Sequence, residues 1–231
     1  MDQLGLFDAI YSARAIRRFR PDLVPDETIA EILGAAVQAP SGGNRQQWLF
    51  IVVKDVEQRR RLAAIYKTAS EIVAAFYAER ARPTHVDEVE YRRMLASGSY
   101  LYEHMDEAPI LLVPCIRAET LKFPPIAQSV EQSALATQID RTRCASIYPA
   151  VENIILACRA LGLGTVITTN HLIYEDEVKQ VLGLPPEIQT HALMPIGYPR
   201  GRFGPVRRRP VAEVAMLDRF GTTWKAADQA N

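Results

Sequence analysis

In two stretches near the N-terminus, residues typical of a helix start are followed by apolar residues at helical spacing. The first begins at Pro25-Asp26-Glu27, where a proline and acidic residues suit an opening helical turn, and Pro40 predicts its end. Asp55 is an N-cap candidate for the second. The spacing predicts two helices, each with one buried face. Their apolar residues are Ile29, Ile32, Leu33, Ala36 and Val37 in the first, and Leu62, Ile65 and Tyr66 in the second.

Continuous apolar runs, several of them rich in β-branched residues, predict buried strands. Such runs occupy residues 48–53, 110–116, 165–169 and 191–197. A turn-forming cluster, Ser-Gly-Gly-Asn at residues 41–44, separates the first predicted helix from the first of these strands. The sequence therefore predicts four strands spread along the whole chain.

Helix-prone segments fill most of the intervals between these strands. Residues 70–108 are polar, aromatic and helix-prone, with one internal break, and residues 149–161 form a strongly apolar helix. Residues 174–182 predict a short helix that Gly183 caps. Residues 121–144 are expected to mix loop and helix.

The alternation of helices and strands predicts the α+β (α/β) class, with a central mixed sheet flanked by helices. No repeat, low-complexity segment or Gly/Ser linker divides the chain, so residues 1–231 are expected to form one domain. The tail, residues 211–231, carries apolar side chains that have no obvious place within the chain. We expect this tail to cross to a partner subunit. Its large apolar residues are Val211, Val214, Met216, Leu217, Phe220 and Trp224.

Composition narrows the classes of function. The chain is 48% hydrophobic and 23% charged, as in ordinary globular proteins, and its formal net charge is zero. A neutral chain gives no general reason to expect nucleic acid or a membrane as partner. The three cysteines form no C-x-x-C pair, and the N-terminus lacks the pattern of a signal peptide, which predicts a reducing, cytoplasmic location.

Familiar catalytic signatures are missing from the sequence. The four histidines show no H-E-x-x-H spacing, so no metal site is expected. No G-x-S-x-G nucleophile elbow and no G-x-G-x-x-G dinucleotide loop occurs. These absences disfavour a metalloenzyme, a serine hydrolase and an ordinary dinucleotide-binding dehydrogenase.

Three separated segments carry a recognisable pattern. The first is Ala-Arg-Ala-Ile-Arg-Arg-Phe at residues 13–19, and the second is Ala-Pro-Ser-Gly-Gly-Asn-Arg-Gln-Gln-Trp at residues 39–48. The third comprises Leu-Gly-Leu-Gly-Thr-Val-Ile-Thr-Thr at 161–169, Pro-Ile-Gly-Tyr-Pro at 195–199 and Arg-Arg-Arg-Pro at 207–210. In this order and at these separations the segments resemble the nitroreductase family.

The resemblance runs from about Asp8 to Glu213 and is slight between Tyr66 and Ala108. The run of threonines at residues 168–169 is similar to the iodotyrosine deiodinase branch of the same superfamily. The resemblance implies an intertwined homodimer with a C-terminal arm and with FMN (flavin mononucleotide) bound at the subunit interface.

The resemblance also assigns arginines to the flavin. Arg14 and Arg208, with Arg209 as a neighbouring candidate, would bind the phosphate, because a guanidinium makes paired, charge-assisted hydrogen bonds. Arg17 would reach the N1–C2=O edge of the ring and stabilise the negative charge of the reduced state. Ala15 stands where the family has a serine, so only its backbone amide could contact the phosphate.

Two further groups of residues are assigned by the resemblance. The turn at residues 40–46 would pack against the flavin of the other subunit, with glycines that allow close approach of the backbone. Thr168 and Thr169 would face flavin N5 with a hydroxyl or amide group. Gln47 stands where the family has proline. The turn residues assigned to the site are Pro40, Ser41, Asn44 and Gln46.

The implied activity is an FMN-dependent NAD(P)H oxidoreductase with a ping-pong mechanism. NADH or NADPH would supply the electrons, and a small-molecule acceptor such as a nitroaromatic compound or a quinone would receive them. Residues 70–108 are interpreted as a substrate lid because the family signature fades there. Two alternatives remain open: a reductive dehalogenase of the deiodinase type, and an FMN-binding module without turnover. No lysine lies between Lys67 and Lys122, so the lid lysine of the deiodinases has no counterpart.

Overall fold

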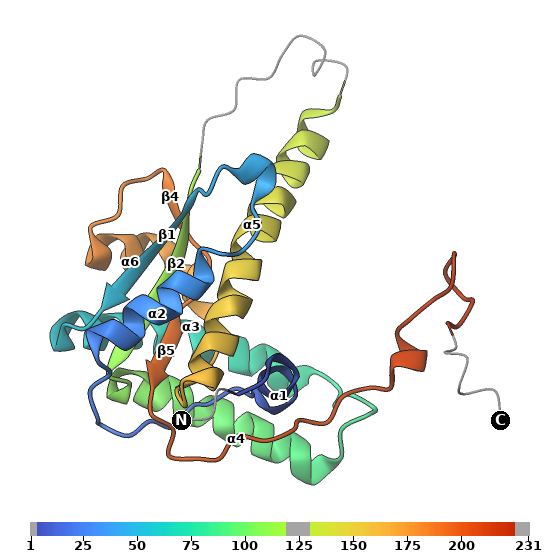
Figure 1. Ribbon diagram of the computed structural model, residues 1–231, viewed down its shortest axis with the longest axis horizontal. Coiled ribbons are helices and arrows are strands. Elements are labelled where there is room, and N and C mark those ends of the chain that lie inside the picture. Colours follow the sequence, from blue (N-terminus) through green and yellow to red (C-terminus); the bar gives the residue numbers. More distant parts are fainter. Residues whose placement is uncertain (1–3, 119–129, 225–231) are drawn as a thin grey trace.

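One five-stranded sheet forms the centre of the protein (Figure 1). In this computed structural model, which describes residues 4–118 and 130–224, the strand order is β1-β2-β5-β3, and β4 also pairs with β2. All described strand pairs are antiparallel, whereas the sequence analysis expected a mixed sheet. The strands are β1 (Trp48–Val53), β2 (Ile110–Arg117), β3 (Gly164–Thr165), β4 (Ile188–Thr190) and β5 (Met194–Gly197).

Strand β2 separates two hydrophobic cores. Its side chains alternate between the faces of the sheet, as the two-residue period of a strand requires. Ile110, Leu112 and Ile116 belong to one cluster of buried residues. Leu111, Val113 and Cys115 belong to the other. Both faces are therefore covered by helices, which explains why the strand is apolar from Ile110 to Ile116.

The first face packs against α2 (Asp26–Ala36) and the long helix α5 (Gln132–Ala160). Helix α2 confirms the prediction from the sequence, whereas α5 begins far before the predicted start at Pro149. Proline removes one backbone donor, yet buried Ile147, Ala150 and Ile154 continue the helical spacing across it. The packing of these side chains outweighs the tendency of proline to end a helix. Residues 121–129 of the stretch expected to mix loop and helix lie outside the described residues.

The second face packs against α3 (Val56–Glu79), α4 (Glu88–His104) and α6 (Glu175–Leu182). The Asp55 side chain accepts a hydrogen bond from the Gln58 amide, which confirms it as N-cap of α3. Gly183 adopts the left-handed conformation with φ of 64°, which confirms it as C-cap of α6. Helices α3 and α4 confirm that residues 70–108 are largely helical. The short helix α1 (Leu6–Ser12) lies against α5.

Two strand predictions need correction. The predicted strand 165–169 is reduced to β3, and Thr168 forms only an isolated bridge with Leu193. The predicted strand 191–197 starts at Met194, and β4 precedes it as a separate, unpredicted element. In both places the chain leaves the hydrogen-bonded sheet and continues as a loop. The pattern of apolar residues does not indicate where this change occurs.

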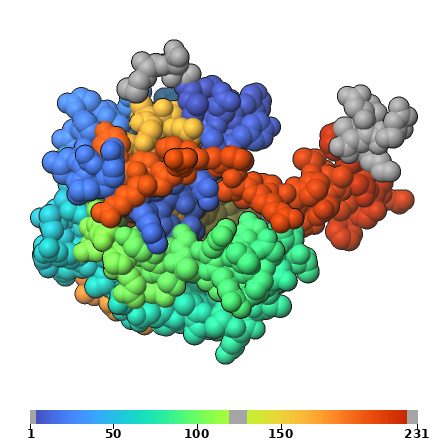
Figure 2. Space-filling view, turned by 90° about the horizontal axis from the view of Figure 1, so that it is seen from below, coloured from blue at the N-terminus to red at the C-terminus, as the bar shows by residue number. Residues whose placement is uncertain are grey.

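The C-terminal segment leaves the body of the molecule (Figures 1 and 2). It contains one turn of 3-10 helix, Val211–Glu213, and its apolar side chains remain exposed, with Phe220 at 95%. These residues have no buried place within the described chain, as the sequence analysis expected. Within residues 4–118 and 130–224, no helix combines the length and hydropathy needed to cross a membrane.

Candidate functional site

A cavity of about 530 Å³ opens between α3, α4 and residues 166–170. Arg17 reaches it from the segment that follows α1, and Thr168 and Thr169 line it from the loop after β3. Three residues that the sequence analysis assigned to the flavin are therefore brought together. Most of the remaining lining comes from α3 and α4 and is apolar or aromatic, including Val73, Met94 and Leu95.

Arg17 supplies the only charge among the described residues that line this cavity. Its guanidinium donates a hydrogen bond of 3.4 Å to the Ser97 hydroxyl on α4, and among the described residues no carboxylate lies within ion-pair distance of it. Burial, with a smaller contribution from nearby Arg14, lowers the pKa of Arg17. A partly buried cation without a counter-ion makes the cavity attractive to an anion or an electron-rich ring edge.

Tyr66, Ser70 and Asn170 form a polar cluster beside Arg17 that the sequence analysis did not assign to the site. All three line the cavity, and the Asn170 side-chain amide donates a hydrogen bond of 3.0 Å to the Ser70 hydroxyl. Burial raises the pKa of Tyr66, while the hydroxyls of Ser70 and Thr168 nearby oppose the rise. The helical spacing marked Tyr66 as a core residue, and only the polar Ser70 four residues later hinted at a polar face.

The two threonines differ in what they can offer a ligand. Thr168 is buried, and its hydroxyl donates a hydrogen bond of 2.6 Å to the Leu193 carbonyl. That proton is therefore not available to a ligand. Thr169 lines the cavity and is exposed, so its hydroxyl is the accessible one.

The turn that contains Pro40, Ser41, Asn44 and Gln46 does not line this cavity. The Ser41 hydroxyl accepts a hydrogen bond of 3.0 Å from the Gln46 amide, and the Gln46 side chain donates to the Asn44 side chain at 3.1 Å. Asn44 and Gln46 both adopt positive φ, at 52° and 49°. The turn is thus a tightly shaped surface loop that packs against α5.

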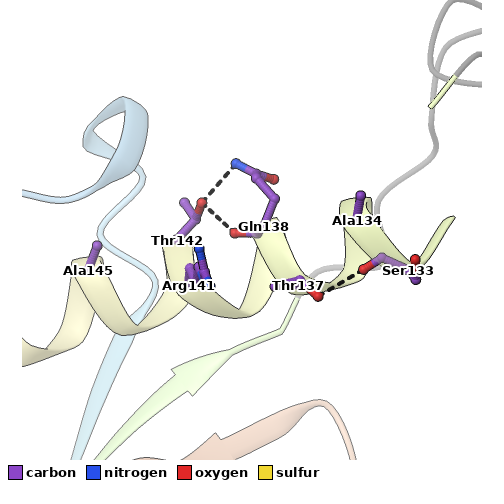
Figure 3. A pocket seen from close by; sticks show the side chains of 7 residues that line it. All are labelled: Ser133, Ala134, Thr137, Gln138, Arg141, Thr142 and Ala145. Carbon is purple, nitrogen blue, oxygen red and sulfur yellow. Dashed lines mark hydrogen bonds between the residues drawn. The ribbon is translucent and has the colours of Figure 1, made fainter. Parts of the chain in front are cut away.

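The surface next to this turn is a shallow groove. A hollow of about 360 Å³ lies between Gly42, Gly43 and α5, and the Gly42 amide donates to the Ser146 hydroxyl at 3.2 Å. A second hollow continues along the exposed amino-terminal part of α5 (Figure 3). Every residue that lines the second hollow belongs to this one helix, from Ser133 to Ala145. One helix face cannot enclose a small ligand, so this hollow is an open surface and not a binding site by itself.

The arginines expected on the phosphate are not gathered at one point in the single chain. Arg14 is exposed and lies close enough to Arg17 to affect its pKa, and Ala15 is exposed beside it. Arg208 makes a described contact only with the neighbouring Arg207 carbonyl, and Arg209 pairs with Glu213 at 3.0 Å. The Arg208 and Arg209 side chains therefore belong to the C-terminal segment and not to the cavity wall.

The groups around the cavity suit the ring system of FMN. Its isoalloxazine has one polar pyrimidine edge and an otherwise apolar surface, and the cavity offers one polar cluster and otherwise apolar and aromatic side chains. Arg17 matches the edge that becomes negative on reduction. No group of three or more metal-ligating side chains occurs in the described parts of the chain.

Known proteins are similar to this chain over most of its length. The sequence model of the family described as "Nitroreductase family" matches residues 10–198. The chain is 30% identical to an NADH dehydrogenase of Thermus thermophilus over 210 residues, which cover 90% of this chain and 93% of that protein. It is 27% identical to iodotyrosine deiodinase 1 of Rattus norvegicus over 212 residues, which cover 91% of this chain and 68% of that protein.

A solved structure shows the same fold. The crystal structure of oxidized iodotyrosine deiodinase bound to FMN and 3-iodo-L-tyrosine matches with a TM-score of 0.68 at 22% identity. The match covers 94% of this chain and 100% of that chain. The chain therefore belongs to the nitroreductase family of flavin-dependent oxidoreductases.

Proposed function

We propose that the protein is a homodimeric, FMN-dependent NAD(P)H oxidoreductase that reduces nitroaromatic compounds, quinones or similar electron-poor acceptors. The observation that carries this proposal is the Arg17 guanidinium, which lies in an otherwise uncharged cavity without a carboxylate partner among the described residues. When bound there, FMN would supply hydride and electron transfer between the two substrates. The names of relatives, an NADH dehydrogenase and an FMN-bound deiodinase, support a flavin and a nicotinamide donor.

The residues of this chain would hold the flavin and tune it. Arg17 would stabilise negative charge on the N1–C2=O edge, and the exposed Thr169 would face the N5 side. Arg14 would bind the phosphate together with Arg208 once the C-terminal segment is in place. The aromatic and apolar side chains of α3 and α4 would exclude water above the ring, which strengthens each of these electrostatic contacts.

The lining of the cavity favours a planar acceptor that is neutral or anionic. Tyr77, Tyr91 and Tyr102 line it, and their rings can stack on an aromatic compound. Among the described lining residues, no carboxylate could pair with the ammonium group of an amino acid. This composition disfavours the deiodinase alternative. Both substrates would occupy the same cavity in turn, as a ping-pong mechanism requires.

Three features support a homodimer. The turn at residues 40–46 and the cavity lie apart in the single chain, although the resemblance assigns both to one flavin site. The apolar residues of the C-terminal segment are exposed. The amino-terminal half of α5, up to Ser146, contains no buried residue. A second copy would cover these surfaces and bring its own turn to the cavity.

The test is anaerobic addition of NADH or NADPH to purified protein that has been incubated with FMN. We expect a bound yellow chromophore that bleaches on addition of the nicotinamide and recovers when a quinone or nitroarene is added. A bound flavin that never bleaches would instead support the alternative of an FMN-binding module without turnover. Colourless protein that remains monomeric with added FMN would contradict the proposal.

A further inference from the structure

Two segments from opposite ends of the chain run antiparallel beside each other. Residues 12–20, which contain Arg14 and Arg17, pair with residues 198–204 at the point where the C-terminal segment begins. The first two of the backbone hydrogen bonds between them lie after Arg17 in the sequence, and the third lies before Arg14. They join the Arg20 amide to the Tyr198 carbonyl at 2.8 Å, the Arg200 amide to the Arg18 carbonyl at 3.0 Å and the Gly204 amide to the Ser12 carbonyl at 3.2 Å.

Arg159, in the last turn of α5, reinforces the contact at Ser12. Its Nε donates a hydrogen bond of 2.8 Å to the Ser12 hydroxyl. The same guanidinium lies over the Phe203 ring, with 4.2 Å between its Cζ and the ring centroid. All three side chains are half-buried, which strengthens a cation–π contact and a hydrogen bond from a charged donor relative to the same contacts in water. One side chain of α5 thus holds both segments together.

Ile16 provides a second anchor, which is independent of Arg159. Its amide donates a hydrogen bond of 3.0 Å to the Thr165 carbonyl of β3. The Ile16 side chain is buried and packs directly on Gly164, where an added Cβ would lie only 2.5 Å from it. This close approach fixes Ile16 against the sheet.

The two arginines depend on these anchors to different degrees. Arg14 lies between Ser12 and Ile16 in the chain, so its backbone is fixed only while both anchors hold. Arg17 follows Ile16 directly, and its guanidinium contacts the Ser97 hydroxyl at the cavity. Release of Ser12 would therefore move Arg14 and leave Arg17 in place.

We propose that Arg159 is a positioning residue that joins Ser12 to Phe203 and thereby holds Arg14 where the phosphate of a flavin nucleotide would bind. This inference rests on the proposed function, which assigns the phosphate to Arg14. It makes flavin affinity depend on the place where the C-terminal segment leaves the body, because Phe203 lies there. The clamp itself involves only groups of this chain, so it can be tested without flavin.

The first experiment measures amide hydrogen exchange in the flavin-free protein. We expect Arg159→Gln to make the Gly204 amide exchange about fivefold to tenfold faster, the effect of losing a charge-assisted hydrogen bond and a cation–π contact. The amides of Ile16 and Arg20 should keep their wild-type rates, because their hydrogen bonds belong to the other points of attachment. Unchanged exchange of Gly204, or equal acceleration of all three amides, would overturn the proposal.

Two further variants test whether the contacts form one clamp. Phe203→Leu removes the ring and keeps an apolar side chain, so it should also accelerate exchange of Gly204. Its effect should not add to that of Arg159→Gln in the double variant. The matched control is Arg202→Gln, because Arg202 is exposed next to Phe203. Strictly additive effects, or an equal acceleration in Arg202→Gln, would contradict the clamp.

The second experiment titrates the protein with FMN and measures the midpoint potential of the flavin at saturation. We expect Arg159→Gln to raise the dissociation constant about threefold to tenfold and to leave the potential at the wild-type value, because Arg17 stays in place. Arg202→Gln should change neither quantity. A shifted potential, or an unchanged dissociation constant with Gly204 exchange accelerated, would disprove the link to the phosphate. Failure of the wild-type protein to bind FMN would instead contradict the proposed function.

Discussion

Arg17 carries a charge that the described part of its own chain does not neutralise. Its guanidinium contacts Ser97 and lies in an uncharged cavity, so a ligand with an electron-rich edge gains a charge-assisted hydrogen bond there. We expect Arg17→Gln to weaken FMN binding by about 10- to 100-fold, which corresponds to one or two such bonds. A fluorescence titration of FMN measures the change.

The neighbouring Arg18 provides the control for this substitution. It is exposed and lies over the Tyr100 ring at 4.2 Å, outside the cavity lining. Arg18→Gln should therefore leave FMN affinity at the wild-type level. Equal losses in the two variants would indicate a general effect of surface charge and would contradict the role assigned to Arg17.

His171 couples the stability of the loop region to pH. Its side chain is fully buried, and neither ring nitrogen has a partner among the described residues. Burial, with a smaller contribution from His191, lowers the pKa of His171 to about 4 from 6.5. The unfolded chain therefore binds more protons than the folded chain between these values, so stability falls as the pH decreases through this window.

The expected loss of unfolding free energy from His171 is on the order of 2 kcal/mol between about pH 7 and about pH 5. Urea unfolding at the two pH values measures it, and His171→Gln should show a shallower dependence. His85→Gln is the control, because His85 is exposed on the loop between α3 and α4. The interpretation fails if His171→Gln and the wild-type protein lose equal stability on acidification.

The sequence identified Arg17, Thr168 and Thr169 as members of one site, and the structure places them around one cavity. This assignment depended on the resemblance to a family, because the local spacing of residues does not indicate that Arg17 and the two threonines lie close together in the fold. The sequence pattern did not assign Tyr66 and Ser70 to the site, because a helical period indicates only which face of a helix is buried. It does not report that part of the buried face borders a cavity.

At the scale of elements, strongly periodic segments were predicted well and interrupted ones were not. Helix α2 matches the pattern because the proline and acidic residues at its start agree with its apolar spacing, and strand β1 matches because its apolar run is continuous. Helix α5 was cut at Pro149, although its burial pattern runs through this residue. Proline usually ends a helix, but here tertiary packing outweighs that tendency. The sequence alone does not indicate this packing.

Helix α4 contributes to the second core and also belongs to the proposed substrate lid. Removing it would disturb the core, so a single substitution is the better test of substrate choice. Leu101 belongs to the second core and is 2% exposed, whereas Met94 lines the cavity from an exposed position. We expect Met94→Gln to raise the KM for a quinone or nitroarene by about threefold to tenfold through lost apolar contact. Steady-state kinetics with two acceptors measures this change.

The same α4 variant should retain its flavin, because Met94 belongs to the proposed lid and not to the polar cluster. Arg93→Gln, on the exposed side of the same helix, is the matched control and should keep the wild-type KM. Loss of FMN in Met94→Gln, or an unchanged KM for every acceptor tested, would contradict the role of α4 as a substrate lid.

At the scale of the whole molecule, the single chain leaves too much apolar surface uncovered. The amino-terminal half of α5 contains no buried residue, and isolated helices of this length are marginal in water. The C-terminal segment extends from the body (Figure 2). Phe220 on this segment is 95% exposed. The sequence predicted this tail from its apolar residues, but the surface that would receive it in the proposed homodimer belongs to a second chain.

Removal of the tail after Pro210 tests the assembly and the site together. If residues beyond Pro210 hold two copies together, the truncated protein should sediment as a monomer at concentrations where the full chain is a dimer. FMN affinity should fall in parallel, because the turn at residues 40–46 would no longer reach the cavity of the other copy. Arg219→Gln, a polar change in the same segment, should preserve both properties. A truncated monomer that binds FMN as tightly as the full chain would show that one chain builds the whole site, and would refute the interface arrangement.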